Sequence, residues 1–278
     1  RPGGGRRVAG RRAVTAALAG RRVLVVGASA GIGRATAVAA VRAGARVVLA
    51  ARRADALAAA VAKAGGGVAV AGDVCRPGGP EQIVAGAVGE LGEIDLLVHT
   101  VGFASLRPLA DTDAATWHAT LSTNVVGLNL LLQAALPHMA PGGVAAVLSS
   151  ETSGAPRHGL VPYAASKAAL EASLRGWRVE HPGARVTCVV VGATQPSEFG
   201  DGFEAGELGR AVESWIRHGV MQEQFMHTDD VAAVLVATMA TALAFPGVGL
   251  EQLVLRSPSA VAGPAWTPGG APQGRDTG

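Results

Sequence analysis

The 278-residue chain is poor in several residue types that would carry a function of their own. It has two cysteines, a single tyrosine and few aromatic residues, which make up 4% of the chain. Cys75 and Cys188 do not stand at a metal-ligand spacing, and the seven histidines are scattered without pairing. Cys188 lies in an apolar run and is expected in a buried strand. The sequence therefore predicts neither a metal site nor a disulfide framework.

Charged residues are also scarce, at 16% of the chain, and the net charge is only +3. No apolar run reaches about 18 residues, so no membrane span is expected. Seven arginines and no acid lie within residues 1–22, and an Arg/Gly arm of this kind can bind nucleic acid. We interpret residues 1–20 instead as a disordered extension, because no aromatic stacking platform accompanies the arginines. Without a targeting signal, a cytoplasmic location is the default expectation.

Ala, Val, Leu and Gly are abundant, and they follow a regular alternation of short and long segments. Seven short apolar runs have the composition of strands: 23–26, 46–50, 68–71, 94–98, 144–148, 185–191 and 251–255. Longer helical stretches lie between or beside them: 32–43, 54–64, 81–91, about 114–137, 163–180 and the run from 231. Continuous apolar strands are typical of parallel strands buried on both faces.

This alternation predicts an α/β fold with one doubly wound, Rossmann-type domain over residues 21–257. Its seven-stranded parallel sheet would carry helices on both faces. No change in composition divides that range. Residues 258–278 are rich in Pro, Gly and Ser and are expected to form a flexible tail.

A glycine-rich turn joins the first predicted strand directly to the first predicted helix, with the spacing GxxxGxG. Glycine here allows a tight turn and a close approach of backbone to a pyrophosphate, and the helix N-terminus favours anions. The position between strand and helix makes a dinucleotide site the preferred interpretation over a simple turn. We expect the cofactor to contact Gly27, Ser29, Ala30, Gly31, Ile32 and Gly33.

The end of the second predicted strand bears on which dinucleotide binds. Many dinucleotide-binding folds carry an acid there that holds the adenosine ribose. This chain has Arg52 and Arg53 and no acid within reach. The planar guanidinium of Arg52 suits a 2′-phosphate, which an acid would repel. The sequence thus favours NADP(H) over NAD(H), although Arg52 can also be a solvated residue at a helix start.

Tyr163 and Lys167 are four residues apart and so share one face of a predicted helix. A free tyrosine has a pKa of about 10 and is a poor base near neutral pH. A neighbouring ammonium is expected to lower that pKa, as is a positively charged nicotinamide. Ser150 follows a predicted strand, thirteen residues upstream of Tyr163, where its hydroxyl can donate to a substrate carbonyl. The spacing selects Ser150, while Thr152 and Ser153 remain alternatives.

Arriving in this order, these motifs resemble the short-chain dehydrogenase/reductase family over roughly residues 21–257. The resemblance implies that Asp73 and Val74 lie around the adenine ring. It implies that Asn124 distorts its helix and holds a water that links Lys167 to solvent, while Lys167 also binds the nicotinamide ribose. Tyr163 would exchange a proton with the substrate oxygen.

The chain departs from the family pattern in three places. The family's Asn-Asn-Ala-Gly is His99-Thr100-Val101-Gly102 here, so the hydrogen bonds that brace this strand must differ, although Gly102 still allows close cofactor approach. Val26 replaces a Thr before the glycine turn. Val191-Gly192 replaces Pro-Gly, and after Gly192 either Thr194, which we prefer, or Ser197 would contact the carboxamide or the phosphates.

The sequence therefore predicts an NADP(H)-dependent oxidoreductase that interconverts a ketone and a secondary alcohol. Tyr163 would be the general acid/base, Lys167 would lower its pKa and Ser150 would polarise the carbonyl. The alternatives are an NAD(H)-linked alcohol dehydrogenase and a non-catalytic dinucleotide-sensing protein of the same fold. The second is disfavoured because a sensor needs no proton relay.

Residues 192–228 are expected to supply an apolar lid, so the substrate would be a small carbonyl or alcohol compound with apolar surface. The apolar and aromatic residues of this stretch are Phe199, Phe203, Leu208, Trp215, Ile216, Met221, Phe225 and Met226. Half of them can equally be core of the loop's own helix. The resemblance further implies a homodimer or homotetramer, with no nucleic-acid partner. Trp177 is either an anchor at that interface or a packing residue on its own sheet.

Overall fold

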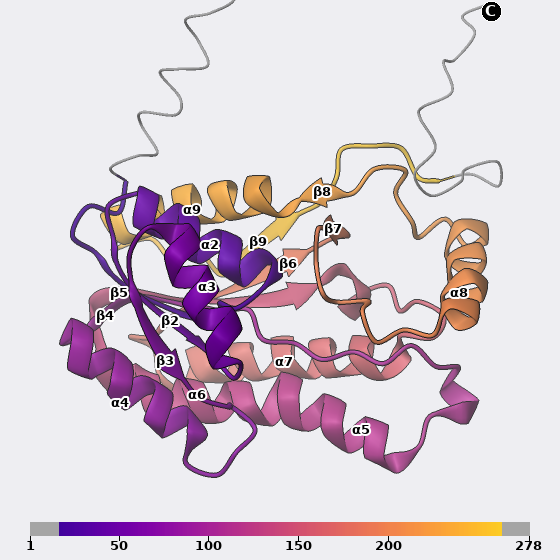
Figure 1. Ribbon diagram of the computed structural model, residues 1–278, viewed down its shortest axis with the longest axis horizontal. Helices are drawn as coiled ribbons and strands as arrows, with labels where there is room; N and C mark the ends of the chain where they lie inside the picture. The colour runs from indigo at the N-terminus through magenta and orange to yellow at the C-terminus, as the bar shows by residue number, and fades with distance from the viewer. Residues whose placement is uncertain (1–16, 263–278) are drawn as a thin grey trace, which may run out of the picture.

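The computed structural model describes residues 17–262 and contains a seven-stranded parallel sheet (Figure 1). The strand order is β3-β2-β1-β4-β5-β6-β9, and every neighbouring pair is parallel. The predicted Rossmann-type sheet is therefore confirmed. The strands are β1 (Arg22–Val26), β2 (Arg46–Ala51), β3 (Val68–Ala71), β4 (Ile94–His99), β5 (Met139–Ser150), β6 (Arg185–Val191) and β9 (Gln252–Leu255).

Helices cover both faces of this sheet (Figure 1), which explains the continuous apolar sequence of its inner strands. The edge strands β3 and β9 are mostly or partly exposed, so the prediction that every strand is buried on both faces is wrong for these two. On β1, Val23 and Val25 point into one core, and Leu24 and Val26 point into the other. All four are at most 1% exposed, and each stabilises the fold by about 2 kcal/mol through burial. One face carries α2 (Gly31–Arg42), α3 (Ala54–Ala64) and α9 (Thr228–Ala244). The other carries α4 (Gly79–Leu91), α6 (Gly127–Ala135) and α7 (Val161–Glu180).

The strand order reverses between β1 and β4, and this reversal locates the place where ligands bind. In open parallel sheets, ligands bind beyond the carboxyl ends of the strands at such a switch point. Here β1 leads into Gly27, β4 leads into residues 100–103 and β5 ends at Ser150. The fold thus brings the glycine turn and the predicted catalytic serine to the same edge of the sheet.

The predicted helix over 114–137 is broken into four parts. It consists of α5 (Ala114–Leu121), a π-helical turn (Ser122–Val126), α6, and a 3-10 turn (Leu136–His138). By length and composition alone, the run Ala114–His138 is apolar enough to cross a membrane. In this fold it packs against α4 and α7 instead, with Leu128, Leu131 and Leu132 in the core, while Val126 and Leu130 are exposed.

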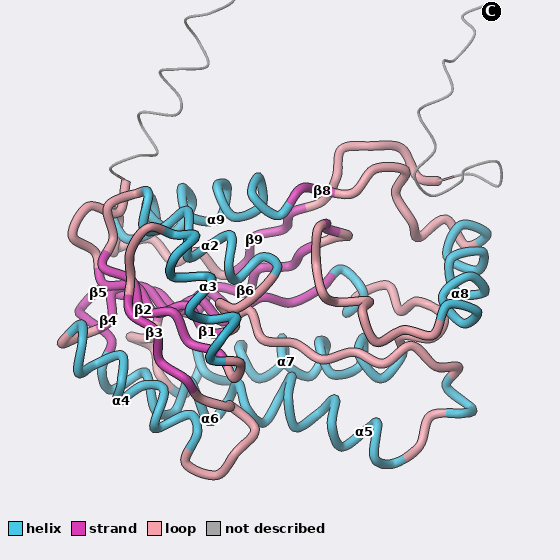
Figure 2. Tube along the Cα trace, viewed as in Figure 1, coloured by secondary structure: helices cyan, strands magenta, loops and turns pink. Residues whose placement is uncertain are grey.

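The segment after β6 forms a small substructure beyond the sheet edge (Figure 2). It contains α8 (Ala205–Arg217) and a parallel pair of two-residue strands, β7 (Thr194–Gln195) and β8 (Met226–His227), which the sequence did not predict. A third apolar cluster holds it together: Leu106, Leu160, Ala211, Trp215, Met221 and Ala262, with Phe203, Leu208, Ile216 and Phe225 packed on it.

The packed body extends a few residues past both predicted domain boundaries. Leu18 is fully buried and its amide donates to Ala43 O at 3.1 Å. Ala262 is 2% exposed and its amide donates to Met221 O at 2.7 Å. The rest of the predicted N-terminal extension and of the predicted tail lies outside the described residues.

Candidate active site

The glycine turn after β1 has the geometry that a phosphate requires. Gly27 has φ +93° and Gly31 has φ +49°, a backbone region that favours glycine. A Cβ at Gly33 would lie 2.2 Å from Gly27 O and 2.4 Å from Thr100 Oγ1, so only glycine fits. Among the described residues, no side chain caps the N-terminus of α2 at Ala30, and its first turn has no acid. Its amides can therefore bind a pyrophosphate.

Two arginines follow β2 beside this turn, and they have different surroundings. Arg52 is exposed, as a residue that meets a phosphate from solvent must be. Arg53 Nη2 is 2.5 Å from Glu198 Oε2, an ion pair that joins β2 to the segment after β6. Ser197, next to Glu198, lies 3.9 Å from the Cβ position of Gly31. The segment after β6 therefore passes close to the glycine turn, a contact that the sequence did not predict.

Asp73 and Val74 lie directly beyond β3, next to the carboxyl end of β2. Asp73 Oδ1 accepts a hydrogen bond from Cys75 N at 2.9 Å. Val74 is 4% exposed and lies 3.0 Å from the Cβ position of Gly127, which requires a residue without a side chain there. These contacts fix the loop on the side of the site where the adenine ring was predicted.

Asn124 stands within the π-helical turn and is fully buried. Its Oδ1 accepts from Phe103 N at 2.7 Å, and its Nδ2 donates to Phe103 O and to Ser166 Oγ, both at 2.8 Å. These bonds tie the segment after β4 to α7. The predicted distortion of the helix at Asn124 is present as the π-helical turn. Because its amide group is engaged by protein, any contact with a relay water would fall to its backbone.

Tyr163, Lys167 and Ser150 meet where β5 ends and α7 begins. Lys167 Nζ is 5.7 Å from the centroid of the Tyr163 ring and donates to Leu148 O at 2.8 Å. Gly102 lies against this group, because its Cβ position is 3.8 Å from both Lys167 Nζ and Asn124 Oδ1. All three predicted catalytic side chains are buried, at 8%, 3% and 8% exposure respectively.

The two alternative hydroxyls near Ser150 are held in other arrangements. Thr152 donates to Ser150 Oγ from its own Oγ1 at 3.0 Å and from its backbone amide at 3.3 Å. Ser153 Oγ points to α7, where it lies 2.6 Å from Glu171 Oε1. It also lies 2.8 Å from the backbone oxygen of Ser150 at the end of β5. Of the three hydroxyls, Ser150 is the one that acts to lower the pKa of Tyr163.

Burial dominates the pKa values of the catalytic pair. It raises the pKa of Tyr163 to about 12, with Ser150 and then Arg157 acting in the opposite direction. It lowers the pKa of Lys167 to about 8. The expectation that Lys167 holds the tyrosine pKa below its ordinary value is therefore wrong for the protein alone. Desolvation of the phenolate outweighs the nearby charges, because the ring is enclosed.

The segment that follows the strand with His99 is braced by Thr100. Its Oγ1 and its amide both donate to Val26 O, at 3.0 and 2.8 Å, so Thr100 joins the end of β4 to the end of β1. His99 is fully buried, and neither ring nitrogen has a hydrogen-bond partner within residues 17–262. Burial, reinforced by the charge of Lys167, lowers its pKa to about 3. The imidazole is therefore neutral at physiological pH.

The loop after β6 brings further side chains to the site. Thr194 Oγ1 donates to Gly192 O at 2.9 Å, and Glu151 packs against Gly192, with Oε2 3.2 Å from its Cβ position. The ring centroids of Phe199 and Tyr163 are 5.1 Å apart in an edge-on arrangement. Of the eight apolar residues predicted for a lid, the other seven pack into the core clusters or against them.

Three charged residues near Ser150 were missed: Glu151, Arg157 and Arg256. Glu151 immediately follows the catalytic serine, which was the one signal available in the sequence. The two arginines could not be found in this way, because they reach Glu151 from the start of a later loop and from the end of β9.

A cavity of about 690 Å³ lies at the opposite ends of β5 and β6, lined in part by Met139, His181 and Arg185. It is far from the catalytic group along these strands and takes no part in it. Trp177 lines this cavity and donates to Asn129 Oδ1 at 2.8 Å. Its ring packs against that of His181 in a tilted arrangement, with the centroids 4.9 Å apart. These contacts favour the interpretation of Trp177 as a packing residue.

Comparison with known proteins agrees with this arrangement. The sequence pattern of short chain dehydrogenases matches residues 21–204. A structure from Burkholderia cenocepacia J2315, a short chain dehydrogenase in complex with NADP, has a TM-score of 0.72 at 28% identity, covering 86% of this chain and 97% of that one. A short-chain type dehydrogenase/reductase from Mycobacterium marinum has a TM-score of 0.73 at 27% identity, covering 90% and 96%.

A curated relative, glycine betaine reductase ATRR of Emericella nidulans, is 37% identical over 70% of this chain, which spans 16% of that protein. The chain spans between 16 and 64% of the length of the curated relatives that it matches first. The chain belongs to the short-chain dehydrogenase/reductase family, an oxidoreductase family whose fold binds a nicotinamide dinucleotide.

Proposed function

We propose that this protein is an NADP(H)-dependent oxidoreductase that interconverts a ketone and a secondary alcohol. One observation carries the proposal: Ser150, Tyr163 and Lys167 meet in a buried group at the carboxyl edge of the sheet, which also holds the glycine turn. A protein that only binds the dinucleotide needs the turn but not a buried acid/base group. The alternative of a dinucleotide-sensing protein therefore leaves the buried group of Ser150, Tyr163 and Lys167 unexplained.

The residues present fit the cofactor. The uncapped N-terminus of α2 and the glycines at 27, 31 and 33 would hold the pyrophosphate. Asp73 and Val74 would flank the adenine, while Gly102, Gly192, Thr194 and Lys167 would contact the nicotinamide riboside. Exposed Arg52 would bind a 2′-phosphate through its planar group of donors, which supports NADP(H) over NAD(H).

The nicotinamide, when bound, supplies or accepts the hydride. In the reductive direction, Ser150 Oγ donates a hydrogen bond to the substrate carbonyl as negative charge develops on its oxygen. Tyr163 gives its phenolic proton to that oxygen. Lys167, with a pKa of about 8, carries a positive charge over much of the neutral range and stabilises the phenolate that is left. Asn124 holds the segment 102–103 against α7, which keeps Lys167 in place.

Phe199 supplies apolar surface beside Tyr163, which supports a substrate with an apolar part. We also propose that the protein is a homo-oligomer, because Val126 and Leu130 on the helical run 114–138 and Val179 on α7 are 51%, 40% and 78% exposed. A monomer mass by light scattering at micromolar concentrations would contradict this. A cytoplasmic location stays a prediction.

The test is a panel of ketones and secondary alcohols, assayed by absorbance of the reduced cofactor with both NADP(H) and NAD(H). Tyr163→Phe should lower kcat by at least about a hundredfold while cofactor affinity is kept, because it removes the acid/base hydroxyl and little else. Undiminished turnover would contradict the mechanism.

The same assay separates the two cofactors. Arg52→Ala should weaken NADP(H) at least about tenfold and leave NAD(H) nearly unchanged, because one charge-assisted phosphate contact is lost. Arg42→Ala, which removes another exposed arginine at the far end of α2, is the matched control. Equal loss for both cofactors would favour the NAD(H)-linked alternative.

A further inference from the structure

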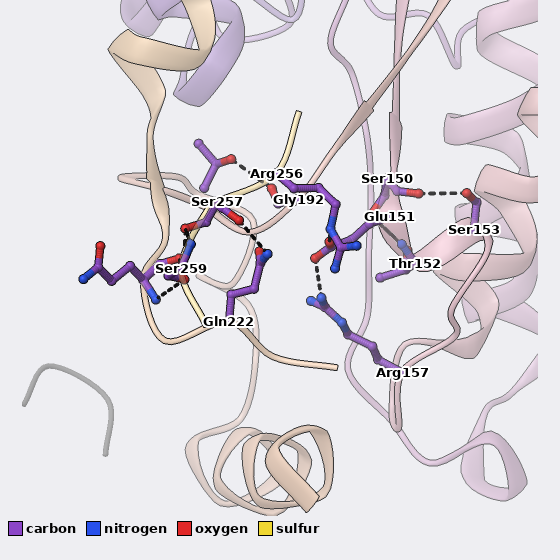
Figure 3. A network of polar contacts seen from close by, with 12 residues as sticks. Ser150, Glu151, Thr152, Ser153, Arg157, Gly192, Gln222, Arg256, Ser257 and Ser259 are labelled. Atoms are coloured by element: carbon purple, nitrogen blue, oxygen red, sulfur yellow. Dashed lines mark hydrogen bonds and ion pairs between the residues drawn. The ribbon is translucent and has the colours of Figure 1, made fainter. Parts of the chain in front are cut away.

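Three charged side chains gather beside the catalytic serine, and the proposed mechanism uses none of them (Figure 3). Glu151 follows Ser150 directly and pairs with Arg157 Nη2 through Oε1. Arg256, from the end of β9, approaches the same carboxylate with its Nε 2.9 Å from Oε2. Figure 3 shows the Glu151 carboxylate between the two guanidinium groups. We call these three residues the Arg–Glu–Arg cluster.

The charges of the cluster do not balance. Two guanidinium groups face one carboxylate, which leaves a net charge of +1. The side chains of Glu151 and Arg157 are only 10% and 11% exposed, whereas that of Arg256 is 54% exposed. A buried unbalanced charge is costly unless a partner neutralises it. In the part of the chain that is described, Arg157 Nε and Glu151 Oε2 are both buried without a hydrogen-bond partner, and Oε2 has only its ion contact with Arg256. The cluster thus has spare positive charge and at least one unused donor.

The position of the cluster points to the substrate. Glu151 packs against Gly192, on the side of the site assigned to the nicotinamide. Arg157 is near enough to Tyr163 to favour its phenolate form. The cluster therefore lies beside the acid/base tyrosine, at the place where the part of the substrate next to its carbonyl would extend.

A purely structural role would account for only part of this arrangement. The Arg157 guanidinium carbon is 5.8 Å from the Trp215 ring centroid, and the Trp215 indole donates to His158 O at 2.9 Å. These contacts fasten α8 to the loop after β5. They would be satisfied by Arg157 and Glu151 alone. The second arginine, Arg256, adds an ion pair with Glu151 Oε2 through its Nε. Its side chain nevertheless remains 54% exposed, which leaves its terminal nitrogens open to a ligand.

We propose that Arg157 and Arg256 form a subsite for a carboxylate of the substrate, so that the enzyme reduces an oxo acid or oxidises the matching hydroxy acid. The inference rests on the proposed function for the reaction itself. A carboxylate matches the planar guanidinium groups and balances the net charge of +1. A phosphate dianion would place excess negative charge beside Glu151, which favours the carboxylate. Phe199 then meets the apolar part of the same molecule.

The test measures binding rather than turnover, so that it stands apart from the catalytic assay. Straight-chain oxo acids with the carbonyl at carbon 2, 3, 4 or 5, and their methyl esters, are titrated calorimetrically into the full chain, with and without saturating NADP⁺. At least one acid should bind tenfold or more tightly than its ester. The acid/ester ratio should fall about tenfold in Arg157→Met and severalfold in Arg256→Met.

Arg210→Met is the matched control, because Arg210 pairs with Glu207 on α8 and is 63% exposed. Its acid/ester ratio should equal that of the unaltered chain. If Arg157→Met does not fold, as judged by circular dichroism, the acid/ester ratio of Arg256→Met tests the subsite, because Arg256 is half-exposed. No acid preference at any carbonyl position, or a preference that both variants keep, overturns the subsite. Tighter binding of a phosphate-bearing ketone than of every acid also overturns the carboxylate assignment.

Failure of the subsite and failure of the proposed function give different results. Ketone turnover that depends on Tyr163 but shows no acid preference removes the subsite and keeps the reaction. Acid-selective binding that depends on Arg157, with no turnover of any ketone or alcohol, keeps the subsite and removes the reaction.

Discussion

The two halves of the sheet's carboxyl edge recognise their ligands by different physical means. In the nucleotide half, beyond β1, β2 and β3, the features are backbone amides, glycines with positive φ and an exposed arginine. In the catalytic half, beyond β4, β5 and β6, they are buried polar side chains, with His99 and Asn124 fully enclosed and Lys167 3% exposed. In the nucleotide half, the space around the backbone determines whether the ligand fits. In the catalytic half, the charges and hydrogen bonds of buried side chains determine how the ligand is bound.

The difference determines what a substitution does in each half. A side chain added to the glycine turn takes up room that the backbone or the cofactor needs, whatever its polarity. A polar group removed from the catalytic half leaves the shape almost unchanged but shifts the balance between desolvation and hydrogen bonding. Three substitutions test this contrast.

The largest effect is expected for Ser150→Ala. Loss of the donor to the developing oxyanion should lower kcat about 100- to 1000-fold, which is the usual cost of one such donor. Affinity for the cofactor should change less than about twofold. Ser153→Ala is the control, because that hydroxyl faces Glu171 and should have a much smaller effect on kcat. Equal losses in both variants would remove the assignment to Ser150.

A smaller effect is expected for Gly33→Ala in the nucleotide half. The added methyl would lie 2.2 Å from Gly27 O, so the turn must move, at a cost of about 1–3 kcal/mol in unfolding free energy. Cofactor affinity, measured by fluorescence titration, should fall at least about tenfold because the displaced amides no longer match the phosphates.

Gly89→Ala controls for the loss of a helical glycine, because no atom lies within 4 Å of its Cβ position. It should stabilise α4 by roughly 0.5–1 kcal/mol and leave cofactor affinity unaltered. If Gly33→Ala also leaves stability and cofactor affinity unaltered, the space around the glycine turn does not control cofactor binding in the nucleotide half.

The smallest effect concerns pH. The pKa of Lys167 is lowered to about 8 in the folded protein, so between pH 8 and 9 the unfolded chain holds a proton that the folded protein has lost. Stability from this group therefore rises with pH in that window, by roughly 1 kcal/mol. Cys188, whose pKa is raised from 9.0 to about 11, begins to oppose this rise as the pH approaches 9, because its thiol ionises first in the unfolded chain. Tyr163, whose pKa is raised to about 12, acts only at higher pH.

Urea unfolding at pH 8 and pH 9 measures this change. Lys167→Met should abolish the rise in unfolding free energy, because the titrating group is gone. If the unfolding free energy of Lys167→Met still rises between pH 8 and pH 9, another group is responsible. The burial of Lys167 would then not account for the electrostatics of the catalytic half.

The sequence predicted the nucleotide half better than the catalytic half, for the same physical reason. In the nucleotide half, the glycine turn and the neighbouring elements depend on residues that are adjacent in the sequence, so the GxxxGxG turn and the bounds of α3 and β3 were visible in the pattern. The spacing also singled out Ser150, Tyr163 and Lys167, which the structure brings together in one buried group. The electrostatics of this group was not visible, because the pKa of Tyr163 depends on enclosure by segments distant in the sequence.

The remaining misses also involve long-range contacts. Glu151 meets Arg256 across about a hundred residues of chain, and Arg53 meets Glu198 from the other half of the fold. The pair β7–β8 consists of two residues on each side, which is too short to leave a periodic signal. The departures at His99 and Thr100 were seen, but only the structure shows that Thr100 provides the brace.

The enclosed imidazole of His99 also bears on how the kinetics of this enzyme can be read. A histidine at an active site is the usual explanation for a rate that changes between pH 6 and 7. Because the pKa of His99 is about 3, no ionisation of this residue enters that interval. An inflection there would have to originate in the substrate or in a histidine elsewhere. If the proposed mechanism holds, the limb of the rate profile that reports Lys167 is expected near pH 8, where this residue gives up its proton.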